Sequence, residues 1–293
     1  MLVACLLVRH QWVPNTVGRV GSLLETFLPW LGVTVPVLLA AAWCRRSTVA
    51  VLAALLPLAA WLLVFGGHLV PVGDPRYDIT VVQHNVSDEN PDPATTVRGL
   101  VHVRPDLVAL QEVTPAELPT WTAALAAQYP HHTVHGTVGL WSRYPLAASG
   151  PVDIRPHGVG ADWNRGLRAV TRMPQGDVAV YVAHLPSVRL GLTGLGSARR
   201  DESAALLGAA IAAEPVERVI LLGDLNGTVH DRALRPVTAQ LTTARSDFAF
   251  SWPAGSPVAR IDQVLGRSVQ ITHIWALPAT GSDHLPVAAR VRF

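Results

Sequence analysis

The chain has 293 residues and a formal net charge of +2. Four of its 23 basic residues and one of its 21 acidic residues precede residue 72, so the remainder carries 19 basic and 20 acidic residues. Proteins that grip nucleic acid usually carry an excess of positive charge, so this balance argues against nucleic acid as the main partner. The two cysteines, Cys5 and Cys44, lie in the apolar N-terminal part, and cysteine usage therefore does not identify a compartment for the remainder.

Two apolar stretches before residue 72 predict a membrane anchor. Thr48–Val70 contains no acidic residue and no arginine, and as a helix it is long enough to cross a hydrocarbon core of about 30 Å. Thr26–Cys44 is a second candidate span, and its two prolines are tolerated in membrane helices. Only Arg45, Arg46 and Ser47 separate the two stretches, which predicts a membrane hairpin.

The two arginines between the spans also predict an orientation. Positive charge in short loops is retained on the cytoplasmic side, so the second span leads outward and everything after Val70 is extracytoplasmic. Met1–Val8 is apolar but too short to cross alone. We therefore expect residues 1–72 to form an integral membrane anchor with two or three transmembrane helices, and residues 73–293 to form a catalytic domain in the extracytoplasmic space.

After a Pro/Gly linker at Pro71–Arg76, strand and helix patterns alternate, which predicts an α/β domain with layered sheets. The expected strands are Asp78–His84, Asp106–Leu110, Val138–Ser142, Gly166–Thr171, Val178–His184, Arg218–Leu222, Ile261–Leu265, Val269–Trp275 and Pro286–Arg292. The expected helices are Pro93–Val103, Pro115–Gln128 and Ser197–Ala213, the last with Ser197 as its cap.

Polar residues stand where the apolar strands end, and catalytic groups tend to cluster on loops that a rigid sheet positions. Taken singly, each has a structural explanation: Asn85 could cap a turn, Glu112 could be an exposed strand end, and His184 could be a core histidine. Together they suggest chemistry. The set comprises Asn85, Glu112, His184, Asp224, Asn226, Asp283 and His284.

These residue types suit metal-assisted attack of water on phosphorus. Asn85 and Glu112 supply the oxygen ligands that a hard cation needs. His284 with Asp283, or Asp224, supplies a base and an orienting carboxylate for the water. Donors for the charge that develops on the phosphoryl oxygens come from two further residues, His184 and Asn226.

Seven short motifs occur in an order that resembles the endonuclease/exonuclease/phosphatase superfamily, whose fold is that of DNase I. The resemblance runs from about Tyr77 to the end of the chain and implies a four-layered α/β/β/α sandwich. The motifs are QHN (Gln83–Asn85), LQEV (Leu110–Val113), LWSRYPL (Leu140–Leu146), VAHLP (Val182–Pro186), GDLN (Gly223–Asn226), RIDQVL (Arg260–Leu265) and GSDHLPV (Gly281–Val287).

The resemblance also implies roles. Glu112, helped by Asn85 and Asp283, would bind Mg²⁺ or Mn²⁺, and His284 would be oriented by Asp283. Asp262 would orient a histidine or assist the metal. Families within this fold differ in which residue is the base, so that role stays open. The implied catalytic residues are His184, Asp224, Asn226, Asp262, Asp283 and His284.

One loop and several arginines bear on the substrate. The segment after His184 carries Leu190, Leu192 and Leu195 among glycines, and such a loop either reaches into lipid or folds back against the domain. Arginine suits bidentate recognition of phosphate. The candidate phosphate ligands are Arg143, Arg165, Arg168 and Arg199.

The layout of membrane helices followed by this domain, together with ETFLPWLG (Glu25–Gly32), resembles the VanJ-type membrane proteins linked to teicoplanin resistance. That resemblance implies a lipid-linked substrate, with undecaprenyl pyrophosphate in cell-wall carrier recycling as the natural candidate. Two alternatives remain: a phospholipid or sphingomyelin phosphodiesterase, for which Trp163 and Trp252 are the candidate exposed aromatics, and an extracytoplasmic nuclease.

Overall fold

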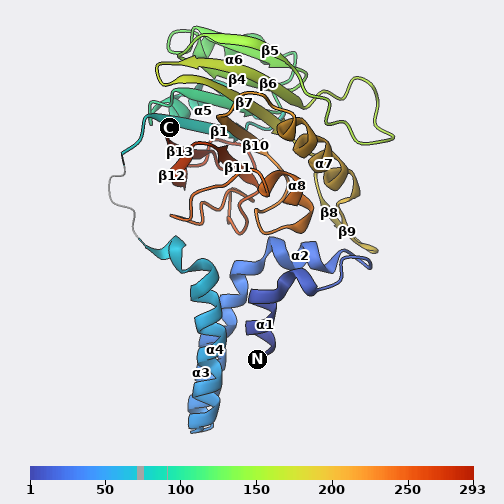
Figure 1. The fold of residues 1–293 in the computed structure, drawn as a ribbon, viewed down its shortest axis with the longest axis vertical. Coiled ribbons are helices and arrows are strands. Elements are labelled where there is room, and N and C mark those ends of the chain that lie inside the picture. The colour runs from blue at the N-terminus through green and yellow to red at the C-terminus, as the bar shows by residue number, and fades with distance from the viewer. Residues whose placement is uncertain (71–75, 91) are drawn as a thin grey trace.

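The computed structural model describes residues 1–70, 76–90 and 92–293. The expected boundary between anchor and catalytic domain, and most of the expected linker, fall on residues 71–75 and lie outside the described residues. Figure 1 shows a two-sheet domain from which a helical hairpin extends, with the short N-terminal helices between the two.

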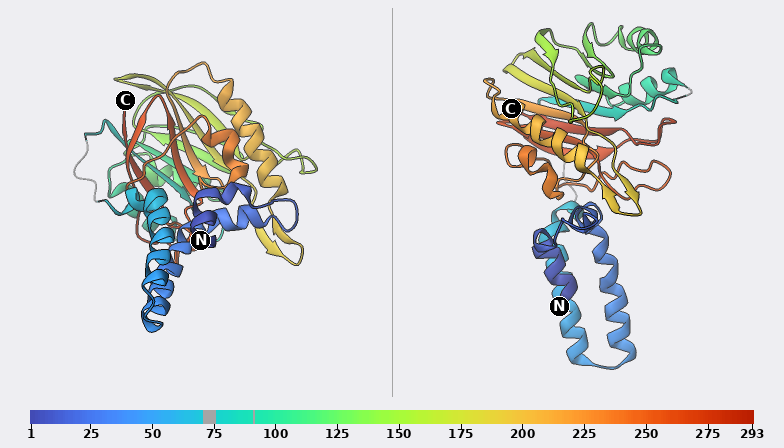
Figure 2. Two further views of the ribbon diagram at one scale, coloured as in Figure 1. Left: turned by 60° about the horizontal axis from the view of Figure 1, so that its bottom comes forward. Right: turned by 90° about the vertical axis from the view of Figure 1, so that its right-hand side faces the viewer.

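The N-terminal part is helical throughout. α3 and α4 lie side by side in a hairpin whose tip points away from the sheets (Figures 1 and 2). Of the described helices, the one that runs continuously over Thr48–Leu69 is the single helix long and apolar enough to cross a membrane alone. The elements are α1 (Leu2–Arg9), η1 (His10–Trp12), α2 (Val20–Thr26), η2 (Leu28–Val33), α3 (Thr34–Cys44), α4 (Thr48–Phe65) and η3 (Gly66–Leu69).

The second expected span differs from a straight helix over Thr26–Cys44. The chain breaks between α2 and η2 and bends there by 73°, so that the outward-pointing segment begins at Leu28. Pro29 and Pro36 stand in the first turns of η2 and α3, and the bend lies ahead of both. A first turn tolerates proline because its amide groups have no partner within the helix.

The remainder forms two mixed sheets. The six-stranded sheet has the order β12-β13-β1-β2-β4-β3, and the five-stranded sheet has the order β11-β10-β7-β6-β5. A separate hairpin is formed by β8 and β9. The strands are β1 (Ile79–Asn85), β2 (Leu107–Gln111), β3 (His131–His135), β4 (Val138–Ser142), β5 (Leu146–Pro151), β6 (Gly166–Met173), β7 (Gly176–His184), β8 (Arg189–Gly191), β9 (Gly194–Gly196), β10 (Val219–Asp224), β11 (Asp262–Arg267), β12 (Gln270–Ala276) and β13 (Val287–Arg292).

Three apolar clusters stack these elements into four layers. One cluster fills the space between the sheets, because both sheets contribute alternate strand residues to it. A second joins the five-stranded sheet to α7 and α8, and a third joins the six-stranded sheet to α5 and α6 (Figure 2). The α/β/β/α expectation is therefore met. The helices are α5 (Pro93–Val101), α6 (Leu118–Leu125), α7 (Ala198–Ala212), η4 (Arg232–Leu234) and α8 (Arg235–Thr238).

Several boundaries differ from the expectation. β3, β5, β8 and β9 were not expected, since their sequences are short, half-exposed or rich in glycine. α6 begins at Leu118, three residues after Pro115, with Pro119 in its first turn. Ser197 does occupy the N-cap of α7, but its hydroxyl donates to the Asp201 carboxylate and does not cap a backbone amide.

Strand direction decides which residues meet. β1 and β2 are parallel, with Asn85 opposite Gln111, and β7 and β10 are parallel, with Asp224 opposite His184. An antiparallel strand reaches the same edge through its first residue. β11 is an example, since it begins with Asp262 opposite Asp224. One edge of the sandwich therefore collects the ends of four strands and the starts of others.

Residues 10–33 are held against the two-sheet domain by an ion pair whose carboxylate is buried. Glu25 is fully buried and accepts hydrogen bonds from Arg232, both from the backbone amide at 2.9 Å and from the guanidinium at 2.9–3.1 Å. Nδ1 of His10 lies 2.7 Å from the same carboxylate. Burial alone would raise the pKa of Glu25, but the hydrogen bonds from His10 and Arg232 lower it. The N-terminal helices are thus part of one packed body with the sheets.

A second contact ties the same segment to the β8–β9 hairpin. The amide of Leu195 donates to the carbonyl of Gly18 at 2.9 Å. Gly194 has a φ of +105°, and a Cβ there would lie 2.2 Å from the Cα of Gly18. Only glycine permits this close approach of two backbones.

Candidate active site

Two carboxylates from different sheets meet at one amide. Nδ2 of Asn85 donates to Oε1 of Glu112 at 3.1 Å and to Oδ2 of Asp224 at 3.2 Å. Asn85 and Asp224 are the last residues of β1 and β10, and Glu112 directly follows β2. Asn85 and Asp224 are buried, whereas the side chain of Glu112 is 27% exposed. The expected meeting of these three side chains is therefore seen.

The backbone of Glu112 has a φ of +63°, in the left-handed region that residues with a Cβ rarely adopt. The chain turns at Glu112, directly after the last residue of β2. Its other carboxylate oxygen, Oε2, accepts from the backbone amide of Asp88 at 3.3 Å. The carboxylate is thus directed into the space between the two strand ends.

His184 lies beside both carboxylates. Its Nε2 is 3.7 Å from Oε1 of Glu112 and 3.6 Å from Oδ2 of Asp224. Nη1 of Arg165 lies 3.2 Å from its Nδ1. Burial lowers the pKa of His184 well below its usual value, and the positive charge of Arg165 lowers it further. The ring is therefore neutral, accepts at Nδ1 from the guanidinium, and presents its Nε2 proton toward the carboxylates.

His284 is held by Asp262. Its Nδ1 lies 2.8 Å from Oδ2 of Asp262, and the other oxygen of that carboxylate accepts from Nε2 of Gln83 at 2.8 Å. Burial opposes the charge on His284, but Asp262 and Asp224 outweigh it and raise the pKa of the imidazole to about 10. At neutral pH this ring is a cation that can donate from Nε2 toward Asp224, which lies 3.8 Å away.

The expectation that Asp283 orients His284 is wrong. The side chain of Asp283 is exposed, and Asp262 occupies the position that orients the ring. Asp283 and His284 lie in the bend before β13, where the side chain of His284 is buried and that of Asp283 faces solvent. Asp262 instead meets the alternative that the family resemblance left for it, namely orienting a histidine.

Asn226 lies on the turn after β10 with a φ of +48°. Its Nδ2 donates to the carbonyl of Leu185 at 2.9 Å and lies 3.3 Å from Oδ2 of Asp224. Its own carbonyl accepts from Nη1 of Arg200 at 2.9 Å. Burial raises the pKa of Asp224 to about 7, although His284 lowers it. Asn226 and His284 thus lie on either side of the buried Asp224 carboxylate, which also contacts Asn85 from the other sheet.

The donor set fits a divalent cation. Glu112 and Asp224 converge on the Asn85 amide at hydrogen-bond distance, and carboxylate oxygens are donors that Mg²⁺ and Mn²⁺ prefer. Asn85 directs its Nδ2 between them while its Oδ1 accepts from the amide of Ser87 at 3.1 Å, so it would act as an oxygen ligand only with its side-chain amide turned over. Asp224, Asp262 and His284 also place ligand atoms within 4.8 Å of one another. Both oxygens of Asp262 are, however, already bonded to Gln83 and His284. The metal site is therefore better placed at Glu112, Asn85 and Asp224 than at Asp262 or the exposed Asp283.

Of the four expected phosphate-binding arginines, one lies at the site. Arg165 directly precedes β6 and contacts His184. Arg143 follows the last residue of β4, which is antiparallel to β2, so it lies at the opposite edge of the sheet near Asp106. Arg199 is exposed on α7, and the buried neighbour Arg200 is the residue that reaches the Asn226 turn.

Arg168 is held in a structural cluster. Its Nε and Nη2 donate to the two oxygens of Glu214 at 2.8 Å and 2.7 Å, and the hydroxyl of Tyr181 donates to the same carboxylate at 2.7 Å. Burial would raise the pKa of Glu214, but hydrogen bonds from Arg168, the Val216 amide and Tyr181 lower it to about 2. This cluster joins β6 and β7 to the end of α7.

We expect Glu214→Gln to lower the free energy of unfolding by about 2 kcal/mol at pH 7 and to leave turnover unchanged. A carboxylate with a lowered pKa stabilises the fold above its unfolded pKa, so the difference from wild type should shrink as the pH falls from 4.5 toward 2. Thermal unfolding at several pH values measures this. Glu217 is exposed, so Glu217→Gln is the matched control. A large loss of turnover in Glu214→Gln would support the expectation that Arg168 binds the phosphate.

The sequence did not reveal the supporting roles of three residues. Gln83 holds Asp262, Arg200 holds the Asn226 turn, and Ser282 joins two strand ends. The hydroxyl of Ser282 donates to the carbonyl of Asn85 at 2.7 Å and accepts from the amide of His284 at 3.0 Å. Gln83 and Ser282 lie inside the QHN and GSDHLPV motifs, so the signal was present but was assigned to their neighbours.

Comparisons with solved structures find the same fold in other proteins. No curated protein matches the sequence. D. rerio TDP2 complexed with single strand DNA product superposes with a TM-score of 0.60 at 18% identity, over 73% of this chain and 99% of that one. Sphingomyelinase C from Streptomyces griseocarneus superposes with a TM-score of 0.54 at 21% identity, over 72% of this chain and 98% of that one. A Staphylococcus aureus beta toxin variant with bound magnesium ions superposes with a TM-score of 0.54 at 16% identity, over 73% of this chain and 99% of that one.

At these identities the solved structures show a shared fold. The family model adds the sequence evidence, because it matches residues 82–284, well over half of the chain, and thereby spans every candidate catalytic and metal-binding residue described above. The chain therefore belongs to the endonuclease/exonuclease/phosphatase family, a group of phosphoesterase hydrolases that use divalent metals.

Proposed function

We propose that the protein is an integral membrane hydrolase that cleaves a lipid-linked phosphate outside the cytoplasm with the help of Mg²⁺ or Mn²⁺. The substrate that we propose is undecaprenyl pyrophosphate. Water attacks the terminal phosphorus, the bridging P–O bond breaks, and the products are undecaprenyl phosphate and inorganic phosphate. This reaction would recycle the lipid carrier of cell-wall synthesis.

The observation that carries the proposal is the direct link between the catalytic turn and the membrane-proximal helix. Nη2 of Arg200 donates to Asp231 at 2.6 Å, while its Nη1 holds the carbonyl of Asn226. The other oxygen of Asp231 accepts from the hydroxyl of Ser22 in α2 at 3.0 Å. α2 leads through η2 into α3, so a short chain of contacts connects the site to the hairpin.

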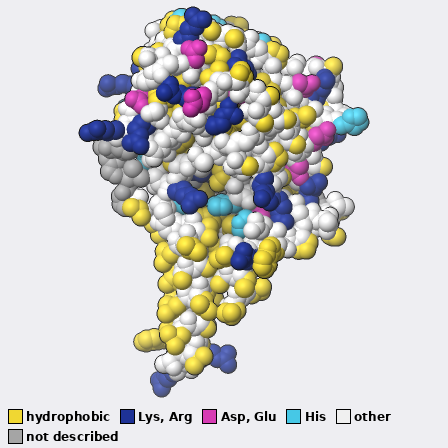
Figure 3. All heavy atoms as spheres, in the orientation of Figure 1, with side chains coloured by type: hydrophobic (Ala, Val, Ile, Leu, Met, Phe, Trp, Pro, Cys, Tyr) yellow, Lys and Arg dark blue, Asp and Glu magenta, His cyan; other side chains and the backbone are white. Residues whose placement is uncertain are grey.

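The hairpin has the features of a membrane segment. Large apolar side chains on both α3 and α4 are exposed, among them Val37, Leu52 and Leu63, and Figure 3 shows an apolar surface that ends in arginines at the tip. Such a surface is stable in hydrocarbon and costly in water. The continuous helix over Thr48–Leu69 has 22 residues, which is about 33 Å and matches a bilayer core.

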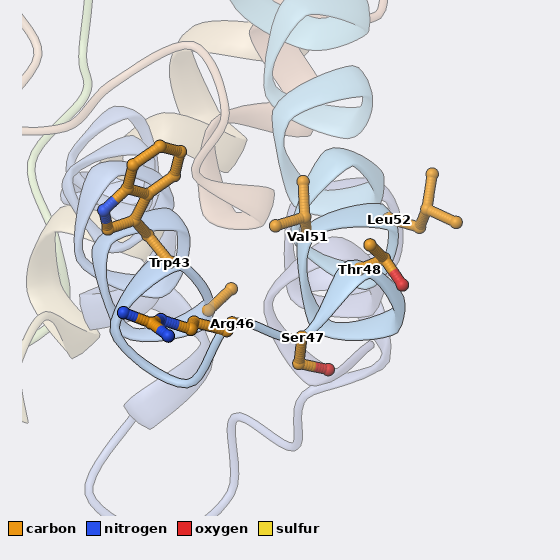
Figure 4. A pocket seen from close by; sticks show the side chains of 7 residues that line it. Trp43, Arg46, Ser47, Thr48, Val51 and Leu52 are labelled. Carbon is orange, nitrogen blue, oxygen red and sulfur yellow. The ribbon is translucent and has the colours of Figure 1, made fainter.

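Aromatic residues mark the two expected membrane boundaries. Trp43 and Arg46 line a space of about 680 Å³ between the tips of α3 and α4 (Figure 4), at the end farthest from the sheets. Trp12 and Trp30 are exposed near the domain end. Tryptophan favours membrane interfaces, and arginine favours the cytoplasmic one. This space therefore lies at the cytoplasmic boundary, away from the chemistry.

The residues of the site divide the reaction among them. Neutral His184 is placed to donate a hydrogen bond to a phosphoryl oxygen, and Arg165 adds positive charge behind it. Asn226 donates to Asp224 and to the carbonyl of Leu185 and thereby positions the carboxylate. His284, charged and held by Asp262, is placed to donate to an oxygen that gains charge in the transition state. A divalent ion held by Glu112, Asn85 and Asp224 would polarise the phosphate and lower the pKa of the attacking water.

The VanJ resemblance of the N-terminal part supports the same conclusion. Glu25, inside the ETFLPWLG segment, is the residue that pairs with Arg232 and fixes the anchor to the domain. The resemblance is thus carried in part by a residue that sets where the site lies relative to the hairpin. It also suggests a role in teicoplanin resistance.

The orientation can be measured with reporter fusions. We expect alkaline phosphatase, which is active only outside the cytoplasm, to be active when it is fused after Phe293 and inactive when it is fused after Ser47 at the hairpin tip. A reporter that works only in the cytoplasm should give the opposite pair of results. Cytoplasmic activity at the C-terminus would rule out the proposed location.

Turnover by the purified full-length protein tests the substrate. With Mg²⁺ or Mn²⁺, phosphate release from undecaprenyl pyrophosphate should exceed cleavage of sphingomyelin, phosphatidylcholine or DNA. The diesterase alternative is favoured by the fold of sphingomyelinase C and by Trp252, which is 37% exposed beside the site. Release of phosphocholine without phosphate release would select that alternative, and cleavage of DNA alone would select a nuclease.

A further inference from the structure

An apolar cavity of about 210 Å³ lies between the N-terminal segment and the catalytic domain. Its walls come from three places far apart in sequence: α2 and the residue that follows it, the β8–β9 hairpin with the loop before it, and the segment around Trp252. The main apolar lining residues are Leu23, Phe27, Val188, Leu190, Leu195 and Trp252.

The inner end of the cavity reaches the site. Asn226 and Arg200 line it there, and Asn226 is bonded to Asp224, the carboxylate that both sheets share. All three guanidinium nitrogens of Arg200 are already bonded, to Asp201, to the Asn226 carbonyl and to Asp231. The cavity therefore offers apolar contact next to the reaction centre, and the Arg200 guanidinium beside it is engaged by Asp201, Asp231 and the Asn226 carbonyl.

The outer end of the cavity faces the hairpin side of the molecule. Figures 1 and 2 place the β8–β9 hairpin on the same side of the sheets as the N-terminal helices. Leu190 is 69% exposed, and Leu192 at the tip of the hairpin is fully exposed. Phe27 is followed directly by η2 and α3, which lead to the apolar hairpin surface. The cavity thus has Asn226 at one end and the exposed apolar side chain of Leu190 at the other.

We propose that this cavity binds the part of the substrate's hydrocarbon chain nearest to the phosphate, and that it thereby selects lipid-linked phosphates over free ones. The inference rests on the proposed function and names the group that recognises the lipid. The cavity is too small for a complete polyprenyl chain, so the distal part of the chain stays in the bilayer. Burial of only a few methylene groups here would raise affinity by more than tenfold.

The cavity wall depends on the glycine contact described above. A Cβ on Gly194 would clash with Gly18, so Gly194→Ala should separate the β8–β9 hairpin from the N-terminal segment. In Gly191 the nearest atom to an added Cβ is 3.9 Å away, which is an ordinary contact. Gly191→Ala is therefore the matched control for Gly194→Ala.

Binding of two non-hydrolysable probes tests the proposal independently of turnover. The probes are the methyl and the geranyl esters of methylenediphosphonate, in which a carbon replaces the bridging oxygen. Calorimetry on full-length protein in nanodiscs with Mg²⁺, corrected with empty nanodiscs, gives the ratio of the two affinities. In wild type we expect the geranyl ester to bind about tenfold or more tightly than the methyl ester.

Filling or charging the cavity should remove this ratio. We expect the affinity ratio to fall toward one in Leu195→Trp, in Gly194→Ala and in Leu190→Asp. Leu190 is exposed at the mouth of the cavity, so Leu190→Asp is the variant that depends least on repacking. The ratio should persist in Leu192→Trp, where the side chain does not line the cavity, and in Gly191→Ala. A ratio near one in wild type, or a ratio unchanged in all three cavity variants, overturns the proposal.

The two levels of inference fail separately. If wild type shows the chain-dependent ratio but releases no phosphate from undecaprenyl pyrophosphate, the cavity stands and the substrate is a different lipid phosphate. If undecaprenyl pyrophosphate is hydrolysed while the ratio is near one, the proposed function stands and the cavity does not bind the chain.

Discussion

Glu112→Gln should lower kcat/KM on the order of 10³-fold, or about 4 kcal/mol of transition-state stabilisation. The substitution keeps the size of the side chain but removes the carboxylate charge from a donor set otherwise made of Asn85 and Asp224. Affinity for Mg²⁺ or Mn²⁺ should fall with it, because ligand charge contributes strongly to the binding of hard cations. Rates measured over a range of metal concentrations separate weaker metal binding from slower chemistry.

Glu89→Gln is the control for this variant. Glu89 lies in the loop after β1, and its side chain is exposed, so the same change of charge near the site should alter kcat/KM less than about threefold. Thermal unfolding checks that both variants are folded. Full activity of Glu112→Gln at low metal concentration would refute its role as a ligand.

Asp262→Asn is expected to have the second large effect. Asn can keep the contact with Gln83 or His284 but cannot stabilise the imidazolium, so the pKa of His284 should fall from about 10 toward or below 6.5. We expect kcat to fall on the order of 10³-fold at pH 8, because the donor proton on His284 is then lost. NMR titration of the histidine and the pH dependence of kcat measure the two effects.

The same pair links stability to pH. A histidine whose pKa is raised in the folded state stabilises the fold fully below its unfolded pKa of 6.5, and this contribution is lost as the pH rises through about 10. The difference in melting temperature between wild type and Asp262→Asn should therefore be larger at pH 6 than at pH 10.5. A constant difference across this range would contradict the ion pair.

Two further aspartates serve as controls for Asp262. Asp177→Asn changes an exposed residue in the β6–β7 hairpin and should leave kcat unchanged. Asp283→Asn should lower the pKa of His284 by less than Asp262→Asn does, since Asp283 acts on the ring only through the weakest of the charges that raise it. The reverse order would restore Asp283 as the orienting residue.

The sequence predicted the shared edge of the site because parallel strands deliver their last residues to one place. Asn85, His184 and Asp224 end apolar runs. The register of β7 with β10 places His184 beside Asp224, and the packing of the two sheets brings Asn85 to Asp224. A run of apolar residues does not reveal strand direction, however. Arg143 follows an apolar run in the same way, but β4 is antiparallel and ends at the opposite edge.

The periodicity of the α-helix explains why Arg199 was expected at the site in place of its neighbour Arg200. Arg199 and Arg200 are adjacent on α7, yet a turn of about 100° per residue exposes the first and buries the second against the Asn226 turn. The choice between Asp283 and Asp262 required the fold, because the correct partner of His284 is 22 residues away in sequence. Sequence spacing identifies which residue types are available but not the face on which each lies.

The ion pair of Glu25 and Arg232 has a consequence for biosynthesis. Its two members are separated by 207 residues, so Glu25 leaves the ribosome long before its partner exists. Until then Glu25 has only His10 beside its carboxylate, and a carboxylate without its full set of partners is costly to bury. The contact that joins the N-terminal segment to the sheets can therefore form only after residue 232 has been synthesised, when most of the chain is already present. The late position of one arginine in the chain thus sets when the two parts of the protein can join.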